Sequence, residues 1–198
     1  MSPQKPDIAD LGWKAGDHVC AFYNDNGNSL ENIIQVYVTT ALQAGDKCIC
    51  FIDRASSVRD RISGELMPRE DILQFFPKDA MYQPGGWFHT DALIRNLDAM
   101  VRNALSDGYK RCWTLADVAY VTQNLDDIKK WFAFEAKLNE FAPQHPQFLM
   151  CLYNLDHFSG DLVMYALQTH PRIFVNGIII PNPYYVPANE FLSILDNT

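Results

Sequence analysis

The chain has 198 residues, of which 48% are hydrophobic and 20% charged, and it carries a formal net charge of −8. This length and composition predict one globular domain and exclude a disordered chain. The acidic balance argues against a nucleic-acid backbone or an anionic membrane as the main partner, because both attract basic surfaces. Since the sequence has neither a membrane-length apolar run nor the apolar core of a secretory signal, we expect a cytoplasmic location.

The cysteines and histidines give no local signature of a metal or redox site. Five cysteines lie within apolar, strand-like stretches, at Cys20, Cys48, Cys50, Cys112 and Cys151. We interpret them as buried small residues in a reducing compartment, because free cysteine is among the most buried residue types. The sequence has no C-x-x-C spacing, and its five histidines show no paired ligand spacing. We therefore expect no metal and no cofactor.

Strand-like and helical patterns alternate through the first half of the chain. The predicted strands are short apolar runs over residues 17–23, 47–53 and 79–83. Helical spacing of apolar residues predicts a helix over residues 29–43, with Ser29 as its N-cap. Two further short helices are predicted over residues 57–65 and 69–76, followed by a turn at residues 84–86.

The second half continues the alternation and fixes the predicted fold class. An apolar stripe from Leu93 to Leu105 predicts one helix, and further helices are predicted over residues 124–141 and 161–169. A short helix is predicted to close the segment of residues 182–195. Predicted strands cover residues 110–118, 147–153, 172–176 and 178–181, the last two forming a hairpin at Gly177. This order predicts an α/β fold with a mostly parallel central sheet, helices on both faces and right-handed crossovers. We expect an N-terminal extension over residues 1–15 and a single domain over residues 16–198.

The turn between the first strand and the first helix occupies the position of a phosphate loop. A working loop reads G-x-x-x-x-G-K-[ST], in which backbone amides and the lysine hold the phosphates. The turn here, NDNGNSLE, has a single glycine, Gly27, and no basic residue occurs between Lys14 and Lys47. Asp25 and Glu31 add negative charge beside the helix start. The sequence therefore predicts that this turn does not hold a nucleotide triphosphate.

Several segments of the sequence resemble one family in their order and spacing. They include HVCAFY at residues 18–23, EAKLN at 135–139, THP at 169–171 and NPYY at 182–185. In this arrangement the chain resembles the MEDS domain, a sensory domain named from methanogen and methylotroph proteins and from a dichloromethane-responsive transcription regulator. The resemblance covers residues 16–187. It implies a RecA-like, P-loop NTPase-type fold without a functional P-loop, serving as the input module of transcription regulators or sensor kinases.

The resemblance also implies a ligand, since the family is thought to sense small hydrocarbon-derived molecules. This chain departs from the family at one strand end, where many members read G-E-M-S-W. Here the sequence is Ala116-Asp117-Val118-Ala119-Tyr120. If this strand end lines the ligand site, the ligand preference of this chain differs from that of the family.

Candidate ligand-binding residues lie mainly where predicted strands end. Phe22 and Tyr23 close the first strand, Asp117 lies at the end of the strand of residues 110–118 and Tyr120 just after it, and Tyr153 closes a later strand. Sheets of this class bind ligands outside the carboxyl ends of their strands, so these side chains form a predicted site. Asp117 also occupies the position of a Walker B acid, although a capped strand end explains it equally well.

Three further candidates come from other parts of the pattern. Glu135 lies on the inward-facing stripe of a predicted helix, so it is either a boundary residue or a polar anchor in a mostly apolar pocket. Asn182 and Tyr184 belong to the NPYY segment, whose aromatic residues either cap the core or supply pocket walls with hydroxyl groups.

We weigh three functions against these observations. The first is a non-catalytic sensory domain of a bacterial or archaeal system, which binds a small molecule and signals to a downstream regulator or kinase module. The alternative is a RecA-like interaction scaffold without a ligand, which assembles as a homo-oligomer. A residual enzyme is the third, but no nucleophile, base and stabilising group occur together in a known pattern.

Overall fold

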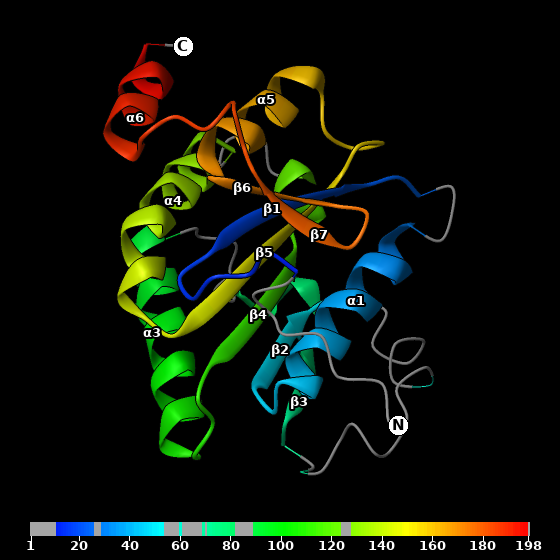
Figure 1. Cartoon of the computed structure of the whole chain (residues 1–198). Coiled ribbons are helices and arrows are strands. Elements are labelled where there is room, and N and C mark those ends of the chain that lie inside the picture. The colour runs from blue at the N-terminus through cyan, green and yellow to red at the C-terminus, as the bar shows by residue number, and fades with distance from the viewer. Residues whose placement is uncertain are drawn as a thin grey trace.

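The computed structural model describes residues 11–25, 29–53, 71–81, 89–123 and 128–197, together with Asp60 and Arg69. Within these residues one seven-stranded sheet has the order β3-β2-β4-β5-β1-β6-β7 (Figure 1). The strands are β1 (His18–Tyr23), β2 (Lys47–Phe51), β3 (Leu73–Phe76), β4 (Cys112–Asp117), β5 (Gln147–Asn154), β6 (Arg172–Val175) and β7 (Ile178–Pro181). All neighbouring strands run parallel except β6 and β7, which are antiparallel. This confirms the predicted mostly parallel α/β class.

Helices cover both faces of the sheet. They are α1 (Ser29–Gln43), α3 (Thr90–Ser106), α4 (Ile128–Phe141), α5 (Gly160–Thr169) and α6 (Ala188–Asp196). Helix α1 packs on one face, whereas α3, α4 and α5 pack on the other, and α6 lies against α4 (Figure 1). None of the described helices is both long and apolar enough to cross a membrane.

The face under α1 contains an aromatic core that begins before the predicted domain boundary. Trp13 is 2% exposed, and its ring packs edge-on against Tyr37, Trp113 and Phe148 at centroid distances of 4.9–5.6 Å. The Tyr37 hydroxyl donates to the carbonyl oxygens of Thr114 and Phe148, both at 2.9 Å. The described end of the predicted N-terminal extension is therefore part of the packed domain.

Two predicted elements of the first half are wrong. Residues 73–76 form strand β3 instead of a helix, and Leu73 to Phe76 pair in parallel with Cys48 to Phe51 of β2. This short apolar run fits both a helical and a strand-like pattern of hydrophobic residues. It forms a strand because it pairs with the free edge of β2. Lys78–Met81 form a short 3-10 helix, η2, where a strand was predicted.

Some predictions fall on residues that the structure does not describe. These are the helix over 57–65 apart from Asp60, the turn at 84–86, and the start of the helix over 124–141.

The predicted hairpin is confirmed. Its two central residues, Asn176 and Gly177, both have positive φ angles, of 50° and 91°. This is the type I′ geometry that joins two strands most tightly.

The sheet has a switch point between its two central strands. β1 and β5 are hydrogen-bonded neighbours, but the helix that follows each of them lies on a different face. Because α1 leaves β1 on one side and α5 leaves β5 on the other, the two connections diverge beyond the strand ends. Such a divergence leaves a crevice outside the carboxyl ends of the strands, where α/β proteins bind ligands.

Candidate functional site

The carboxyl ends of β1, β4 and β5, here called the carboxyl edge, bring two predicted residues into contact. The Tyr23 hydroxyl donates to both carboxylate oxygens of Asp117 at 3.2 Å, and the Ala119 amide donates to one of them at 3.0 Å. Burial raises the pKa of Asp117, an effect that the Ala119 amide and the Tyr23 hydroxyl partly offset. Burial and the charge of Asp117 also raise the pKa of Tyr23, so its phenol stays protonated and donates at neutral pH.

A second set of polar contacts ties the loop after β1 to the loop after β5. Asn154 donates to Asp25 at 2.7 Å, and the Asp25 amide donates to Asp156 at 2.6 Å. The His157 ring lies 3.3 Å from the other Asp25 oxygen. Asn24 donates to Asp156 at 3.1 Å, which completes the connection. Carboxylates and amides therefore connect the two loops at the carboxyl edge.

The charges at this edge do not suit a polyphosphate. Among the described residues, Lys78 lies near Asp117, but its ammonium pairs with Asp53 at 2.9 Å. His157 is likewise occupied by Asp25. Among the described residues, this edge therefore presents aspartates and no free cation.

Beside the carboxyl edge lies a groove with a volume of about 510 Å³, here called the hairpin groove. It runs between α1 and the β6–β7 hairpin. Its apolar walls come from Phe22, Ile33, Val36, Phe174 and Val175, and its polar side chains are Ser29, Asn32 and Asn176. Among the described residues, no charged side chain lines this groove. Its size is within the range of small-molecule sites, and its lining suits an uncharged or weakly polar ligand.

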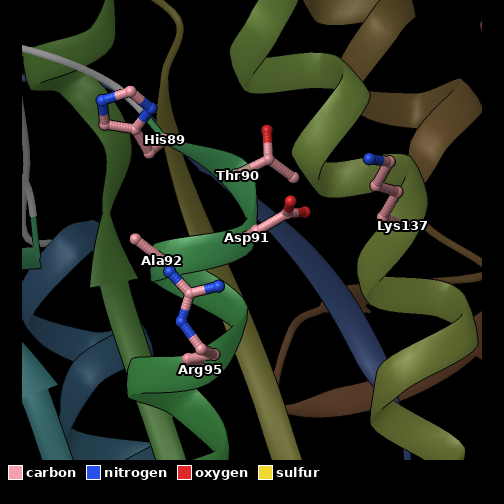
Figure 2. Close-up of a pocket in the computed structure, with 6 residues that line it drawn as sticks. All are labelled: His89, Thr90, Asp91, Ala92, Arg95 and Lys137. Atoms are coloured by element: carbon pink, nitrogen blue, oxygen red, sulfur yellow. The ribbon is translucent and has the colours of Figure 1, made fainter.

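A different hollow, of about 380 Å³, lies where the start of α3 approaches α4 (Figure 2). Its lining consists of His89, Thr90, Asp91, Ala92, Arg95 and Lys137. Thr90 and Asp91 lie on the side of α3 that faces Lys137 of α4 (Figure 2). Its mixture of opposite charges contrasts with the uncharged lining of the hairpin groove, and it contains none of the predicted ligand-binding residues.

Glu135 does not lie at the carboxyl edge but beneath the sheet, in a fully buried polar centre. Its carboxylate Oε2 lies 2.9 Å from His18 Nε2, 3.4 Å from His170 Nε2 and 3.6 Å from Cys151 Sγ. The Tyr153 hydroxyl donates to Oε1 at 3.0 Å. We call His18, Glu135, Cys151 and His170 the buried cluster. The interpretation of Glu135 as a boundary residue is excluded, because its side chain is 0% exposed.

The electrostatics of the buried cluster depend on its imidazoles. Burial alone would raise the pKa of Glu135, but the contact with His18 and the hydrogen bond from the Tyr153 hydroxyl hold the carboxyl pKa below its ordinary value. Burial, together with the charge of His18, lowers the pKa of His170 to about 3. His170 is therefore neutral at physiological pH, while Glu135 is ionised.

The remaining predicted residues have other surroundings. Asn182 donates to the carbonyl oxygens of Leu167 and His170, both at 2.6 Å, and so fixes the end of α5. Tyr184 is 57% exposed. Neither residue lines the hairpin groove. Tyr120 lies in the 3-10 helix η3 (Val118–Gln123), and its side chain is outside the described part of the structure.

Sequence reasoning missed His18, Cys151 and His170 as partners of Glu135. Their separation along the chain gives no ligand spacing, because four different elements supply them. A usable signal did exist. His18 is a polar residue in an otherwise apolar strand, and Glu135 interrupts an apolar helical stripe, so both predict polar groups that must meet inside the core.

The fold defines an α/β domain built on a mostly parallel seven-stranded sheet with helices on both faces. Residues 17–171 match the family described as MEDS, the methanogen/methylotroph, DcmR sensory domain, and the chain belongs to this family. The resemblance found in the sequence is thereby confirmed. A search of curated proteins finds no match.

Proposed function

We propose that the chain is the non-catalytic sensory domain of a bacterial or archaeal signalling or transcription-regulatory system. It binds a small, uncharged or weakly polar molecule, such as a hydrocarbon derivative, in the hairpin groove. The observation that carries this proposal is the lining of the groove, which combines five apolar side chains with three neutral polar ones. Because no charged side chain among the described residues lines the groove, it cannot balance the charge of a desolvated ion and favours neutral ligands over anions and cations.

The proposal includes the loss of an ancestral nucleotide site from a RecA-like, P-loop NTPase-type fold. Its support is the order of strand β1 (His18–Tyr23) and helix α1 (Ser29–Gln43), which is also the order of elements around a phosphate loop. The sequence of the turn lacks the lysine, and Asp25, Asp117 and Asp156 occupy the surrounding strand ends. Repulsion from these carboxylates would oppose ATP, which carries several negative charges.

Signalling follows from the position of the groove against the hairpin. A ligand between α1 and β6–β7 contacts Val36 on one side and Phe174 and Asn176 on the other. It would stabilise one placement of the hairpin relative to the helix and so shift a conformational equilibrium. A downstream regulator or kinase module would respond to this shift. In this proposal the domain works in the cytoplasm and contacts neither nucleic acid nor membrane.

The alternative is an interaction scaffold, and one observation favours it. The hairpin exposes Val175, Ile178 and Ile180, which are 36–50% accessible to solvent. Apolar side chains on an edge strand are a common contact surface between protein chains. On this alternative, the hairpin joins copies of the chain into a homo-oligomer and the groove stays without a ligand.

A thermal-shift screen of the purified chain tests the proposal. The screen compares Mg-ATP with small neutral organic molecules, including haloalkanes, alcohols and ketones. We expect stabilisation by one or more neutral compounds and none by Mg-ATP. Val36→Trp fills the groove and should abolish the shift, whereas Thr39→Trp is the matched control, since Thr39 is half-buried on the same helix but does not line the groove.

Three results would contradict the proposal. Stabilisation by Mg-ATP would show that the edge still binds nucleotide. An equal loss of response in both tryptophan variants would place the ligand elsewhere or indicate a general packing defect. A stable oligomer in native mass spectrometry, with no response to any small molecule, would favour the scaffold.

A further inference from the structure

The buried cluster has the composition of a metal site. It contains two imidazole nitrogens, one thiol and one carboxylate, and one candidate ligand atom from each residue lies within 4.8 Å of all the others. All four residues are buried. They come from β1, α4, β5 and the residue that follows α5. We propose that His18, Glu135, Cys151 and His170 bind a single divalent transition metal ion, and that Zn²⁺ is the ion they match best.

The hydrogen bonds of His170 orient its ring toward the centre of the cluster. Its Nδ1 lies 2.7 Å from the carbonyl oxygen of Ala166. Because a carbonyl oxygen can only accept, Nδ1 carries the proton and the neutral ring keeps a lone pair on Nε2. This lone pair points at Glu135 Oε2, 3.4 Å away, which is also an acceptor. His170 Nε2 has no hydrogen-bond donor and is fully buried.

His18 has the same orientation for a similar reason. Its Nδ1 lies 3.0 Å from the amide oxygen of Asn139. The amide nitrogen of Asn139 is committed elsewhere, since it donates to the carbonyl oxygens of Thr169 and Ala136 at 2.7 and 3.2 Å. The amide therefore presents its oxygen to His18, and His18 Nδ1 donates. Both imidazoles thus direct Nε2 inward while an outer acceptor holds Nδ1–H, which is the arrangement of metal-ligating histidines.

The spacing of the ligand atoms suits four-coordination. Bonds of about 2.0–2.3 Å to nitrogen, oxygen and sulfur place tetrahedral ligand atoms roughly 3.3–3.8 Å apart. In the buried cluster, Cys151 Sγ lies 3.8 Å from His18 Nε2 and 3.6 Å from Glu135 Oε2. His170 Nε2 lies 3.4 Å from the same carboxylate oxygen. The pair of His18 and Glu135, at 2.9 Å, has to separate slightly, and the other ligand atoms lie within 4.8 Å of one another.

Charge balance favours a divalent ion in this buried position. On binding, the Cys151 thiol loses its proton to solvent, as does any proton held between His18 Nε2 and Glu135 Oε2. Thiolate and carboxylate together carry two negative charges, and both imidazoles are neutral. A divalent cation therefore leaves the buried centre uncharged. Nitrogen, sulfur and oxygen ligands in one tetrahedral set favour Zn²⁺ over Mg²⁺ or Ca²⁺, which require oxygen ligands.

The same set closes around the ion without an open position. Four protein ligands complete a tetrahedral shell, which is typical of structural rather than catalytic zinc. Tyr153 fixes the second carboxylate oxygen of Glu135, and Asn139 fixes the ring of His18. Such outer contacts usually change metal affinity about 10–100-fold. The site would join the two central strands to α4 and to the end of α5, independently of any ligand in the hairpin groove.

Elemental analysis of the untagged chain provides the first test. After expression in zinc-supplemented medium and purification without chelators, we expect about one zinc ion per folded chain. The protein is then unfolded with a chelator and refolded with Co²⁺, which reports thiolate ligation by a charge-transfer band in the near ultraviolet. We expect this band in the wild-type chain, together with the visible bands of tetrahedral Co²⁺.

Variants assign the ligands. Cys151→Ser should abolish the thiolate band, whereas Cys112→Ser should keep it, because Cys112 is equally buried but outside the cluster. Asn139→Ala should weaken Co²⁺ binding by about 10–100-fold without removing the band, as expected for a positioning residue. Far-ultraviolet circular dichroism confirms that each variant is folded.

Two results would overturn the proposal, and the first needs only the wild-type chain. One is a folded wild-type chain that contains no stoichiometric metal and gives no cobalt spectrum after refolding. The other is a thiolate band that persists in Cys151→Ser, which would assign the metal to a different cysteine.

Discussion

Two tyrosine–carboxylate pairs in this molecule have nearly the same geometry and opposite electrostatics. At the carboxyl edge, Tyr23 donates to Asp117 at 3.2 Å, and in the buried cluster Tyr153 donates to Glu135 at 3.0 Å. Burial raises the pKa of Asp117. Glu135 is more deeply buried, yet the contact with His18 and the hydrogen bond from Tyr153 hold its pKa below the ordinary value. The surrounding partners, rather than depth alone, decide whether a buried carboxylate keeps its charge.

The largest expected effect on stability comes from removing the buried carboxylate of Glu135. Glu135→Ala should lower the free energy of unfolding by about 3–5 kcal/mol, because it leaves a buried imidazole and a buried hydroxyl without their acceptor. Urea denaturation of the purified variant measures this loss. Glu140→Ala is the control on the same helix, where Glu140 is exposed and the change should stay within about 0.5 kcal/mol. Equal effects for the two variants would refute the importance of the buried contacts.

Deleting the hydroxyl from each tyrosine compares the two pairs directly. Tyr153→Phe should cost about 1–3 kcal/mol, since it leaves a carboxylate oxygen unsatisfied in the core. Tyr23→Phe should cost only about 0.5–1.5 kcal/mol, because Asp117 is half-buried and retains the Ala119 amide. Chemical denaturation at pH 7 gives both values. A larger loss for Tyr23→Phe would reverse the comparison.

The smallest effect, and the only stabilising one, is expected at Asp117. Its raised pKa means that the folded state holds a proton more tightly than the unfolded chain does. The stability associated with this group is therefore complete below its unfolded pKa and is lost as the pH rises through its folded pKa. Asp117→Asn, which cannot ionise, should raise stability at pH 7 by up to about 1 kcal/mol.

Thermal unfolding at neutral and acidic pH checks this sign. The advantage of Asp117→Asn should shrink as the pH falls below the folded pKa of Asp117. Asp98→Asn provides the opposite case, because the hydrogen bond and charge of Arg102 lower the pKa of Asp98. That variant should lose rather than gain stability at pH 7. Stabilisation by Asp98→Asn alone would contradict both assignments.

The comparison also shows what the sequence can and cannot predict about the site. The carboxyl edge was predictable because a parallel sheet places all its strand ends together, so Tyr23 and Asp117 could be expected to meet. The buried cluster was not, since its members lie on four elements whose side-chain register is set by tertiary packing. For Glu135, the sequence indicated an inward-facing carboxylate but could not identify the imidazoles that would compensate it.

The fold was predicted more completely than the site. The errors in the predicted secondary structure have a physical cause. Long amphipathic segments such as Ser29–Gln43 determine their own structure, because many residues contribute to one periodic pattern. Strand β3 has only four residues, and pairing with β2 decides its conformation. The order of the strands depends on which helix covers which face, and this information is distributed over the whole chain.

The place of β1 between β5 and β6 has a consequence for how the chain reaches this structure. The first strand finds both of its neighbours in the last third of the sequence, at residues 147–154 and 172–175. During synthesis, β1 therefore cannot pair with either neighbour until most of the chain has left the ribosome. Such long-range parallel pairing slows folding and makes the domain assemble as one cooperative unit.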